Sequence, residues 1–129
     1  MANFAKFRAS HLRLGRRGEN KVCEYLYRMN CNVLQRNYRH GRDEIDIIAL
    51  DGLTICFVEV KTRKVPLKTR PASGLDEGQK KRIRRAANHY LSDIGNPKLP
   101  HRFDLAEVVF NDFDLVEFRY WADSFGKAV

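Results

Sequence analysis

The sequence is poor in cysteine, and its cysteines form no recognisable pattern. Cys23, Cys31 and Cys56 are the only three in 129 residues, and they belong to no CxxC motif and no Cys/His cluster. The sequence therefore argues against a disulfide scaffold and against a zinc ribbon. We interpret all three as core or half-buried thiols, which predicts a reduced, cytoplasmic protein.

Long apolar runs are also missing. No stretch approaches the roughly 20 apolar residues that a membrane helix needs, so we expect no membrane partner. The segment from Met1 to Arg17 has no continuous apolar core, which argues against a secretory signal. This segment is basic and lacks acids, and we expect residues 1–10 to form a solvated basic arm rather than a transit peptide.

Acidic residues are outnumbered by basic ones. The chain has 24 Lys+Arg against 16 Asp+Glu, a formal net charge of +8. Such a surplus of positive charge favours a polyanionic partner, and nucleic acid is the first candidate. Basic side chains neutralise its phosphates and release the bound counterions. The length predicts a single domain over residues 1–129.

The hydrophobic pattern predicts an α/β domain in which helices cover a mixed sheet. Its order is α-β-β-β-α-β-β: a helix over residues 11–30, strands over 33–36, 44–50 and 53–61, a helix over 76–92 that starts at the N-cap Asp76, and strands over 103–110 and 115–121. We expect a polar loop over 37–42 and a basic loop over 63–74.

The first helix carries two glycines on its buried stripe. Val22 and Leu26 define this stripe, and its backward projection passes through Glu19, Gly18 and Gly15. Each glycine costs about 1 kcal/mol of helix propensity. We therefore expect this helix to approach a neighbouring element closely, with Glu19 directed inward.

The pair of strands 44–50 and 53–61 surrounds Asp51-Gly52, a strong hairpin signal. A two-residue loop at these positions pairs Leu50 with Leu53 and puts Asp46 opposite Phe57. Glu59 is then a diagonal neighbour of Asp46, about 7–8 Å away. On this register Asp46, Glu59 and Lys61 share one face.

Both faces of this hairpin are otherwise apolar, so both are covered. Ile48, Leu50, Leu53, Ile55 and Phe57 lie on the face of Asp46, and Ile45, Ile47, Cys56, Val58 and Val60 lie on the other. Charged groups at such a place need partners. An Asp/Glu–Lys ion network or a strand end frayed into solvent is one interpretation. The other is a magnesium site, because nearby carboxylates repel unless a cation or a proton lies between them.

The order of these residues is similar to that of a known nuclease constellation. Glu59-Val60-Lys61, thirteen residues after Asp46 and preceded by Glu19 on a helix, resembles the PD-(D/E)xK motif. Over residues 14–125 the chain resembles the YraN family of small restriction-endonuclease-like proteins. The matching segments include Gly15–Glu19, Glu44–Ile48, Phe57–Arg63 and Arg102–Asp104. The sequence departs from the pattern at Ile45, where the motif name has proline, and at Asp43, where the family usually has glycine.

The resemblance implies a restriction-endonuclease-like core and a metal-dependent nuclease site. Asp46, Glu59 and the Val60 carbonyl would bind Mg²⁺ or Mn²⁺, and Lys61 would orient the attacking water and steady the phosphate charge. Glu19 would be a further carboxylate of the site or a ligand of a second metal. Gln79, at the head of the second helix, matches a glutamine that related resolvases and exonucleases place beside their sites.

Basic side chains follow the candidate motif closely. We interpret them as a rim that binds phosphates, with a solvated helix face as the alternative. These residues are Arg63, Lys64, Lys68, Arg70, Lys80, Lys81, Arg84 and Arg85.

The sequence as a whole favours a metal-dependent nuclease that acts on nucleic acid. We expect DNA as the substrate, including branched or flapped forms. Two alternatives stay open: a module that binds nucleic acid without cutting it, and a subunit that needs a protein partner for activity. The oligomeric state, including a homodimer, is open as well.

Overall fold

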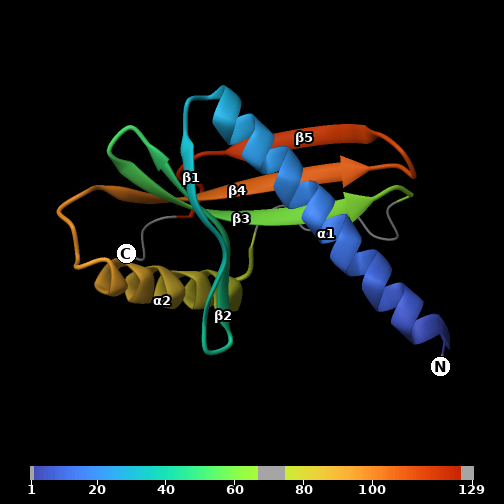
Figure 1. The fold of residues 1–129 in the computed structure, drawn as a ribbon, viewed down its shortest axis with the longest axis horizontal. Helices are drawn as coiled ribbons and strands as arrows, with labels where there is room; N and C mark the ends of the chain where they lie inside the picture. The colour runs from blue at the N-terminus through green and yellow to red at the C-terminus, as the bar shows by residue number, and fades with distance from the viewer. Residues whose placement is uncertain (1, 67–74, 126–129) are drawn as a thin grey trace.

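The computed structural model describes residues 2–66 and 75–125. Five strands form one mixed sheet in the order β1-β2-β3-β4-β5, with α1 and α2 on its two faces (Figure 1). The elements are α1 (Ala2–Arg28), β1 (Asn32–His40), β2 (Asp43–Asp51), β3 (Thr54–Lys64), α2 (Glu77–Asp93), β4 (His101–Phe110) and β5 (Leu115–Trp121). This order confirms the predicted α-β-β-β-α-β-β arrangement. Strands β3 and β4 are parallel, and the other three neighbouring pairs are antiparallel.

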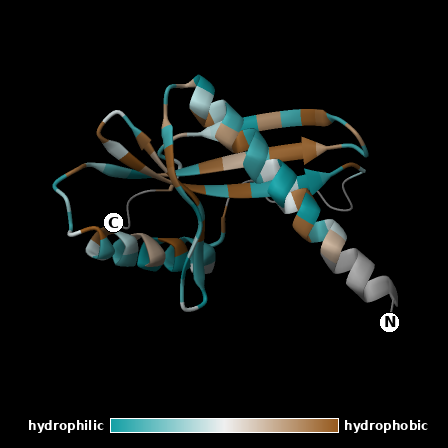
Figure 2. Cartoon of the chain, in the orientation of Figure 1, coloured by the Kyte–Doolittle hydropathy of each residue, from teal (hydrophilic) through white to brown (hydrophobic). Residues whose placement is uncertain are grey.

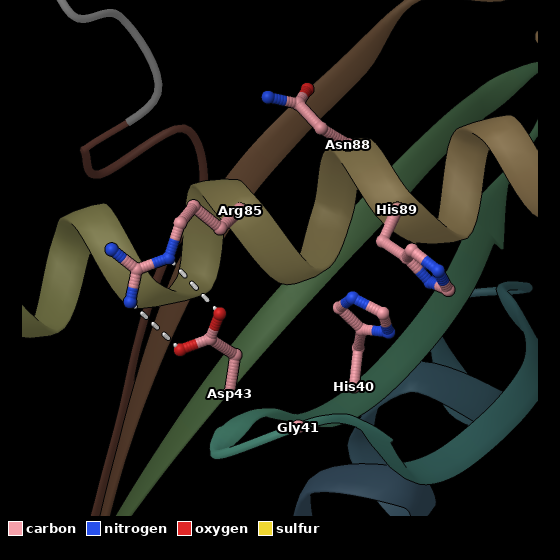
Figure 3. A pocket seen from close by; sticks show the side chains of 6 residues that line it. All are labelled: His40, Gly41, Asp43, Arg85, Asn88 and His89. Atoms are coloured by element: carbon pink, nitrogen blue, oxygen red, sulfur yellow. Dashed lines mark hydrogen bonds and ion pairs between the residues drawn. The ribbon is translucent and has the colours of Figure 1, made fainter.

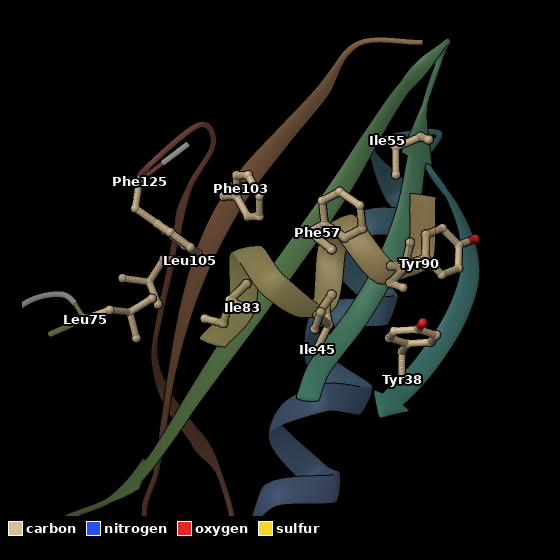
Figure 4. Close-up of a cluster of buried hydrophobic side chains, with 13 residues drawn as sticks. Tyr38, Ile45, Ile55, Phe57, Leu75, Ile83, Tyr90, Phe103, Leu105 and Phe125 are labelled. Carbon is tan, nitrogen blue, oxygen red and sulfur yellow. The ribbon is translucent and has the colours of Figure 1, made fainter. Parts of the chain in front are cut away.

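The sheet separates two hydrophobic cores. Under α1, Val22 and Leu26 pack with Val58 and its neighbours. Under α2, Ile83 and Tyr90 pack with a larger aromatic cluster centred on Phe57 (Figure 4). Figure 2 shows apolar residues along the central strands and polar ones on much of the two helices. Within the described residues, no helix is long and apolar enough to cross a membrane.

Helix α1 is longer than its hydrophobic stripe predicts. It begins at Ala2 rather than at residue 11, so most of the segment expected to be an arm continues the helix. Its first turns extend beyond the sheet (Figure 1). The stripe identifies only the turns that pack, and it is silent about turns without a buried face.

Strand β1 corrects the prediction of a short strand followed by a polar loop. Residues 37–40, expected in the loop, belong to the strand, and residues 38–40 pair with β2. The register shifts between Val33 and Gln35, and Asn37 has a φ of 53°. Asparagine tolerates this left-handed conformation, so the strand continues through a residue that looks like a turn former.

The β2–β3 hairpin turns one residue later than predicted. Asp51 pairs with Thr54 and Leu50 with Ile55, so the two-residue loop is Gly52-Leu53. The predicted Leu50–Leu53 pair is therefore wrong. Gly52 occupies the first loop position with a φ of 60°, a conformation that glycine adopts without steric cost.

Helix α2 begins with the capping box at its predicted N-cap. The Asp76 side chain accepts a hydrogen bond from the Gln79 N–H at 2.8 Å, and the Asp76 N–H donates to Gln79 Oε1 at 3.1 Å. Of the predicted basic loop, Arg63 and Lys64 lie in β3. Lys68 and Arg70 lie outside the described residues.

Candidate active site

Strands β2 and β3 separate at Asp46. Their ladder is regular as far as the pair Ile47–Val58, and the Val60 N–H then donates to Asp46 Oδ2 at 2.8 Å. A side-chain carboxylate thus takes the place of a backbone acceptor. Ile45 packs under α2 whereas Ile47 packs under α1, so the expected placement of these two residues on one face is wrong. The alternation of β2 breaks at Asp46.

Asp46 and Glu59 come together at this break. The register places Phe57 opposite Ile48 rather than opposite Asp46, and a side-chain hydrogen bond between Asp46 and Glu59 contributes to the pKa shifts of both groups. The predicted diagonal relation is therefore wrong, although the predicted proximity is found. The loop lies one residue later than predicted, so the register changes by two. In the paired part of the hairpin, from Ile47 to Val58, this change keeps each side chain on the face expected from alternation.

The environment of this pair disfavours two negative charges. Burial raises the pKa of both carboxyl groups, and each is raised further by neighbouring acidic side chains. Glu19 and Glu44 act in this way on Asp46, and Asp46 and Glu44 act on Glu59. A proton shared by the two groups relieves the repulsion when no cation is bound.

Glu19 reaches the pair from α1. Gly18 makes this approach possible, since a Cβ atom at this position would lie 1.9 Å from Thr62 Oγ1 on β3. The prediction of a close helix approach is thus confirmed at Gly18. It is wrong for Gly15, whose Cβ would meet no atom within 4 Å. Glu19 Oε1 lies 3.4 Å from Arg36 Nη2.

Glu44 belongs to the same acidic neighbourhood, and the sequence analysis missed it. It lies two residues before Asp46 on β2, and its charge raises the pKa of both Asp46 and Glu59. Period-two spacing from Asp46 was the signal that could have found it. Its carboxylate forms an ion pair with Arg39 at 3.8 Å.

Lys61 and Gln79 have different relations to the pair. The positive charge of Lys61 lowers the pKa of Glu59 against the dominant effect of burial, so this ammonium group is near the carboxyls. The Gln79 side chain instead uses its amide oxygen to cap α2. Of these two side chains, the structure therefore links only Lys61 electrostatically to the carboxyl pair.

The donors at the break suit a hard divalent cation. In residues 2–66 and 75–125, no group of three or more His, Cys, Asp or Glu side chains is arranged to hold a metal ion. Two carboxylates and the Val60 carbonyl are nevertheless oxygen donors, which Mg²⁺ and Mn²⁺ prefer, and Mg²⁺ usually completes its shell with water and substrate. A cation between the two groups would offset the repulsion by which Asp46 raises the pKa of Glu59. The residues present therefore fit a cation held by Asp46 and Glu59.

The predicted basic rim divides into side chains with different partners. Arg85 donates two hydrogen bonds to the buried carboxylate of Asp43, at 3.1 and 3.0 Å. Arg84 donates to the Phe125 carbonyl at 3.3 Å. These two arginines connect α2 to other parts of the fold, which limits their availability to phosphates.

The described lysines of the rim, by contrast, lie at the surface. Lys64 forms an ion pair with Asp112 at 2.7 Å, and Lys80 forms one with Glu77 at 3.3 Å. Lys81 is exposed on α2. Arg63 donates to the Thr62 carbonyl at 3.1 Å.

A second polar cluster joins the β1–β2 turn to α2. His40 stacks on His89 with ring centroids 3.3 Å apart, in a shallow pocket that Asp43 and Arg85 also line (Figure 3). The Tyr38 hydroxyl contacts His89 Nδ1 at 2.6 Å and donates to an Asp93 carboxylate oxygen at 2.9 Å. The sequence spacing of the histidines did not indicate this contact. Its partners make it a joint between the hairpin and the helix.

Together these features define a small α/β protein with a half-buried carboxylate pair where two strands of a mixed sheet separate. The profile of the family described as "Uncharacterised protein family UPF0102" matches residues 18–108. The chain belongs to this family, which is also known as YraN.

Relatives in several bacteria are similar over most of their length. A UPF0102 protein of Chlorobium phaeobacteroides strain BS1 is 46% identical over 100 residues, covering 78% of this chain and 79% of its own. A UPF0102 protein of Chlorobaculum parvum is 44% identical over 101 residues, covering 78% of each chain. One of Alkaliphilus metalliredigens is 38% identical over 96 residues, covering 74% of this chain and 84% of its own.

Proposed function

We propose that this protein is a metal-dependent nuclease with a restriction-endonuclease-like, PD-(D/E)xK core, and that DNA is its substrate. The observation that carries the proposal is the pair Asp46 and Glu59, hydrogen bonded where β2 leaves β3, with the charge of Lys61 acting on Glu59. A structural ion pair would match each carboxylate with a base. Here two carboxyls lie close together and the charge of Asp46 raises the pKa of Glu59, a repulsion that a divalent cation would relieve.

The chain's own residues divide the work of phosphodiester hydrolysis. Asp46 and Glu59 would hold Mg²⁺ or Mn²⁺ with the Val60 carbonyl, and the bound metal would supply Lewis acidity and activate water. The Lys61 ammonium, close to Glu59, would orient the water and stabilise charge that develops on the phosphate. Glu19 adds negative charge beside Asp46 and strengthens the attraction for a cation.

The net charge of +8 supports a polyanionic substrate. The three free cysteines, of which Cys31 and Cys56 are buried, support a reduced cytoplasmic location. A module that binds DNA without cutting it has the same net charge. The carboxyl pair favours the nuclease, because buried acids near a phosphate weaken binding unless a cation neutralises them.

A cleavage assay on the full chain tests the proposal. End-labelled duplex, flap, four-way-junction and single-stranded DNA would be incubated in Mg²⁺, in Mn²⁺ and in EDTA. The comparison variant is Asp46→Asn/Glu59→Gln, which keeps shape and hydrogen bonding and removes both charges. The matched control is Glu24→Gln, an exposed carboxylate on α1 that pairs only with Lys21 among the ion pairs of the described residues.

We expect cleavage by the parent and by Glu24→Gln, and none in EDTA or by the double variant. Cleavage by the double variant at the parent's rate would show that Asp46 and Glu59 are not the site. Salt-sensitive binding without cleavage in any metal would instead identify the non-catalytic module.

A further inference from the structure

Strand β1 carries two arginines on the edge of the sheet beside the carboxyl pair. Arg36 pairs with Ile47 and Arg39 with Glu44, so the two arginines bracket Asp46 along the neighbouring strand. Asn37, with its φ of 53°, lies between them. In a strand, three residues span on the order of 10 Å. The two guanidinium groups therefore approach the site from two positions along the edge.

Both arginines are loosely held by acidic residues of that same site. Arg36 Nη2 lies 3.4 Å from Glu19 and Arg39 Nε lies 3.8 Å from Glu44. Both distances exceed the roughly 2.7–2.9 Å of a strong charge-assisted hydrogen bond. The Arg36 and Arg39 side chains are 36% and 73% exposed. The Arg39–Glu44 pair lies at the surface and contributes little stability, whereas Glu19 is only 14% exposed and needs a cation beside it.

Arg85 shows what a structural arginine looks like in the same molecule. It is bound bidentately by Asp43, whose side chain is only 11% exposed. Exchanging this partner for a phosphate would leave a buried carboxylate without its cation. Arg36 and Arg39 can exchange partners at much lower cost, because their partners belong to a site that would itself gain a cation.

We propose that Arg36 and Arg39 form a phosphate clamp, which holds the backbone of a DNA strand across the β1 edge on either side of the Asp46–Glu59 pair. This inference rests on the proposed function, since the strand it positions is the substrate. A cation at the Asp46–Glu59 pair would compensate the charges of Glu19 and Glu44, and each guanidinium group would then be available to a phosphate. The planar fork of arginine suits a phosphate, which accepts two parallel hydrogen bonds.

The test is binding of fluorescently labelled single-stranded and duplex DNA by the full chain in Ca²⁺, a divalent cation that carboxylates bind, measured by anisotropy over a salt series. The variants are Arg36→Ala and Arg39→Ala. The matched control is Arg119→Ala, which removes an arginine that pairs with Glu117 and is 58% exposed on β5, the opposite edge of the sheet. Thermal melting of each variant checks that the fold is retained.

Each clamp variant should lower the slope of log K against log salt by about 1, and weaken binding about five-fold at 0.15 M salt. Arg119→Ala should leave the slope unchanged. Arg36→Lys should restore the slope because it restores the charge. Equal losses in all three alanine variants would show a general charge effect and overturn the clamp, as would the absence of any DNA binding by the parent.

Cleavage and binding separate the two proposals. Parent protein that binds through Arg36 and Arg39 without cutting in any metal would refute the nuclease and leave the clamp standing. Parent protein that cuts DNA while both alanine variants bind normally would refute the clamp alone.

Discussion

Gly18 and Gly15 lie one turn apart on α1, and replacing each by alanine should change stability in opposite directions. Alanine improves helix propensity by about 1 kcal/mol at either position. At Gly15 nothing lies within 4 Å of the new Cβ, so we expect Gly15→Ala to stabilise the protein by up to about 1 kcal/mol.

At Gly18 the new Cβ would lie 1.9 Å from Thr62 Oγ1 and 3.0 Å from two Thr62 carbons. Rotating the threonine side chain removes the first contact but not the one to its Cβ, so α1 must move away from β3. Overpacking of this kind costs about 1–3 kcal/mol, and more where the backbone must shift. After the propensity gain, Gly18→Ala should destabilise the protein by about 1–2 kcal/mol.

Urea unfolding followed by circular dichroism measures both effects. With a slope of about 1–3 kcal/mol per molar urea, a difference of about 2–3 kcal/mol between the variants moves the midpoints apart by on the order of 1 M. Adding Thr62→Ala to Gly18→Ala should recover part of the loss, and a double-mutant cycle quantifies the coupling. Equal shifts of the same sign for Gly15→Ala and Gly18→Ala would refute the close approach.

Three further predictions concern the buried acids. Glu59→Gln should gain stability relative to the parent as the pH rises above the ordinary carboxyl range of about 4. Folding raises the pKa of Glu59, so above that range the unfolded parent releases a proton that the folded parent keeps, and folding must take this proton up. The gain is about 1.4 kcal/mol for each pH unit up to the folded pKa. Melting curves at pH 4 and pH 8.5 check this, and an advantage that is the same at both pH values would contradict it. Mn²⁺ binding should release a proton from the Asp46–Glu59 pair. The heat of Mn²⁺ binding, measured by calorimetry, should therefore depend on the ionisation enthalpy of the buffer. A heat that is the same in all buffers would show that the pair is already ionised. Asp104→Ala should lower the free energy of unfolding, measured in urea, by about 3–5 kcal/mol. The reason is that the fully buried Asp104 carboxylate accepts hydrogen bonds from Arg102 and Tyr120. A loss below about 1 kcal/mol would show that this network is dispensable.

The order of elements could be predicted because the strongest sequence signals are local. The stripe of Ile83, Ala86 and Tyr90 determines the buried face of α2, and the capping box at Asp76 determines where the helix starts. The extent of β1 could not be predicted in the same way. Its residues are mostly exposed, and pairing with β2 rather than its own composition makes it a strand.

The proximity of Asp46 and Glu59 was predictable from the sequence, but their exact geometry was not. Proximity of Asp46 and Glu59 depends on alternation along two strands, and a change of two in the register preserves alternation. Their direct contact depends on the break in β2, where Ile45 and Ile47 enter different cores. No local sequence pattern encodes such a break, because it arises from packing on both faces of the sheet.

Ion pairs between distant elements were also beyond the sequence. The pairing of Arg85 with Asp43 requires α2 and the β1–β2 turn to be placed relative to each other. A run of basic residues shows only that charge is present. The contacts in the folded protein determine which of those basic side chains form stabilising ion pairs and which remain available to a ligand.

The single parallel pair of strands divides the molecule into two parts of different connectivity. The charged side chains of the candidate site all lie in α1, β2 and β3, before the α2 crossover that leads to β4. They are Glu19, Glu44, Asp46, Glu59 and Lys61. Asp46 and Glu59 meet by closing a short hairpin, which carries a small loop-closure entropy, whereas joining β3 to β4 requires the chain to pass through α2 first. These acidic side chains therefore belong to the locally connected N-terminal part of the chain. The later strands β4 and β5 complete the sheet but contribute none of them.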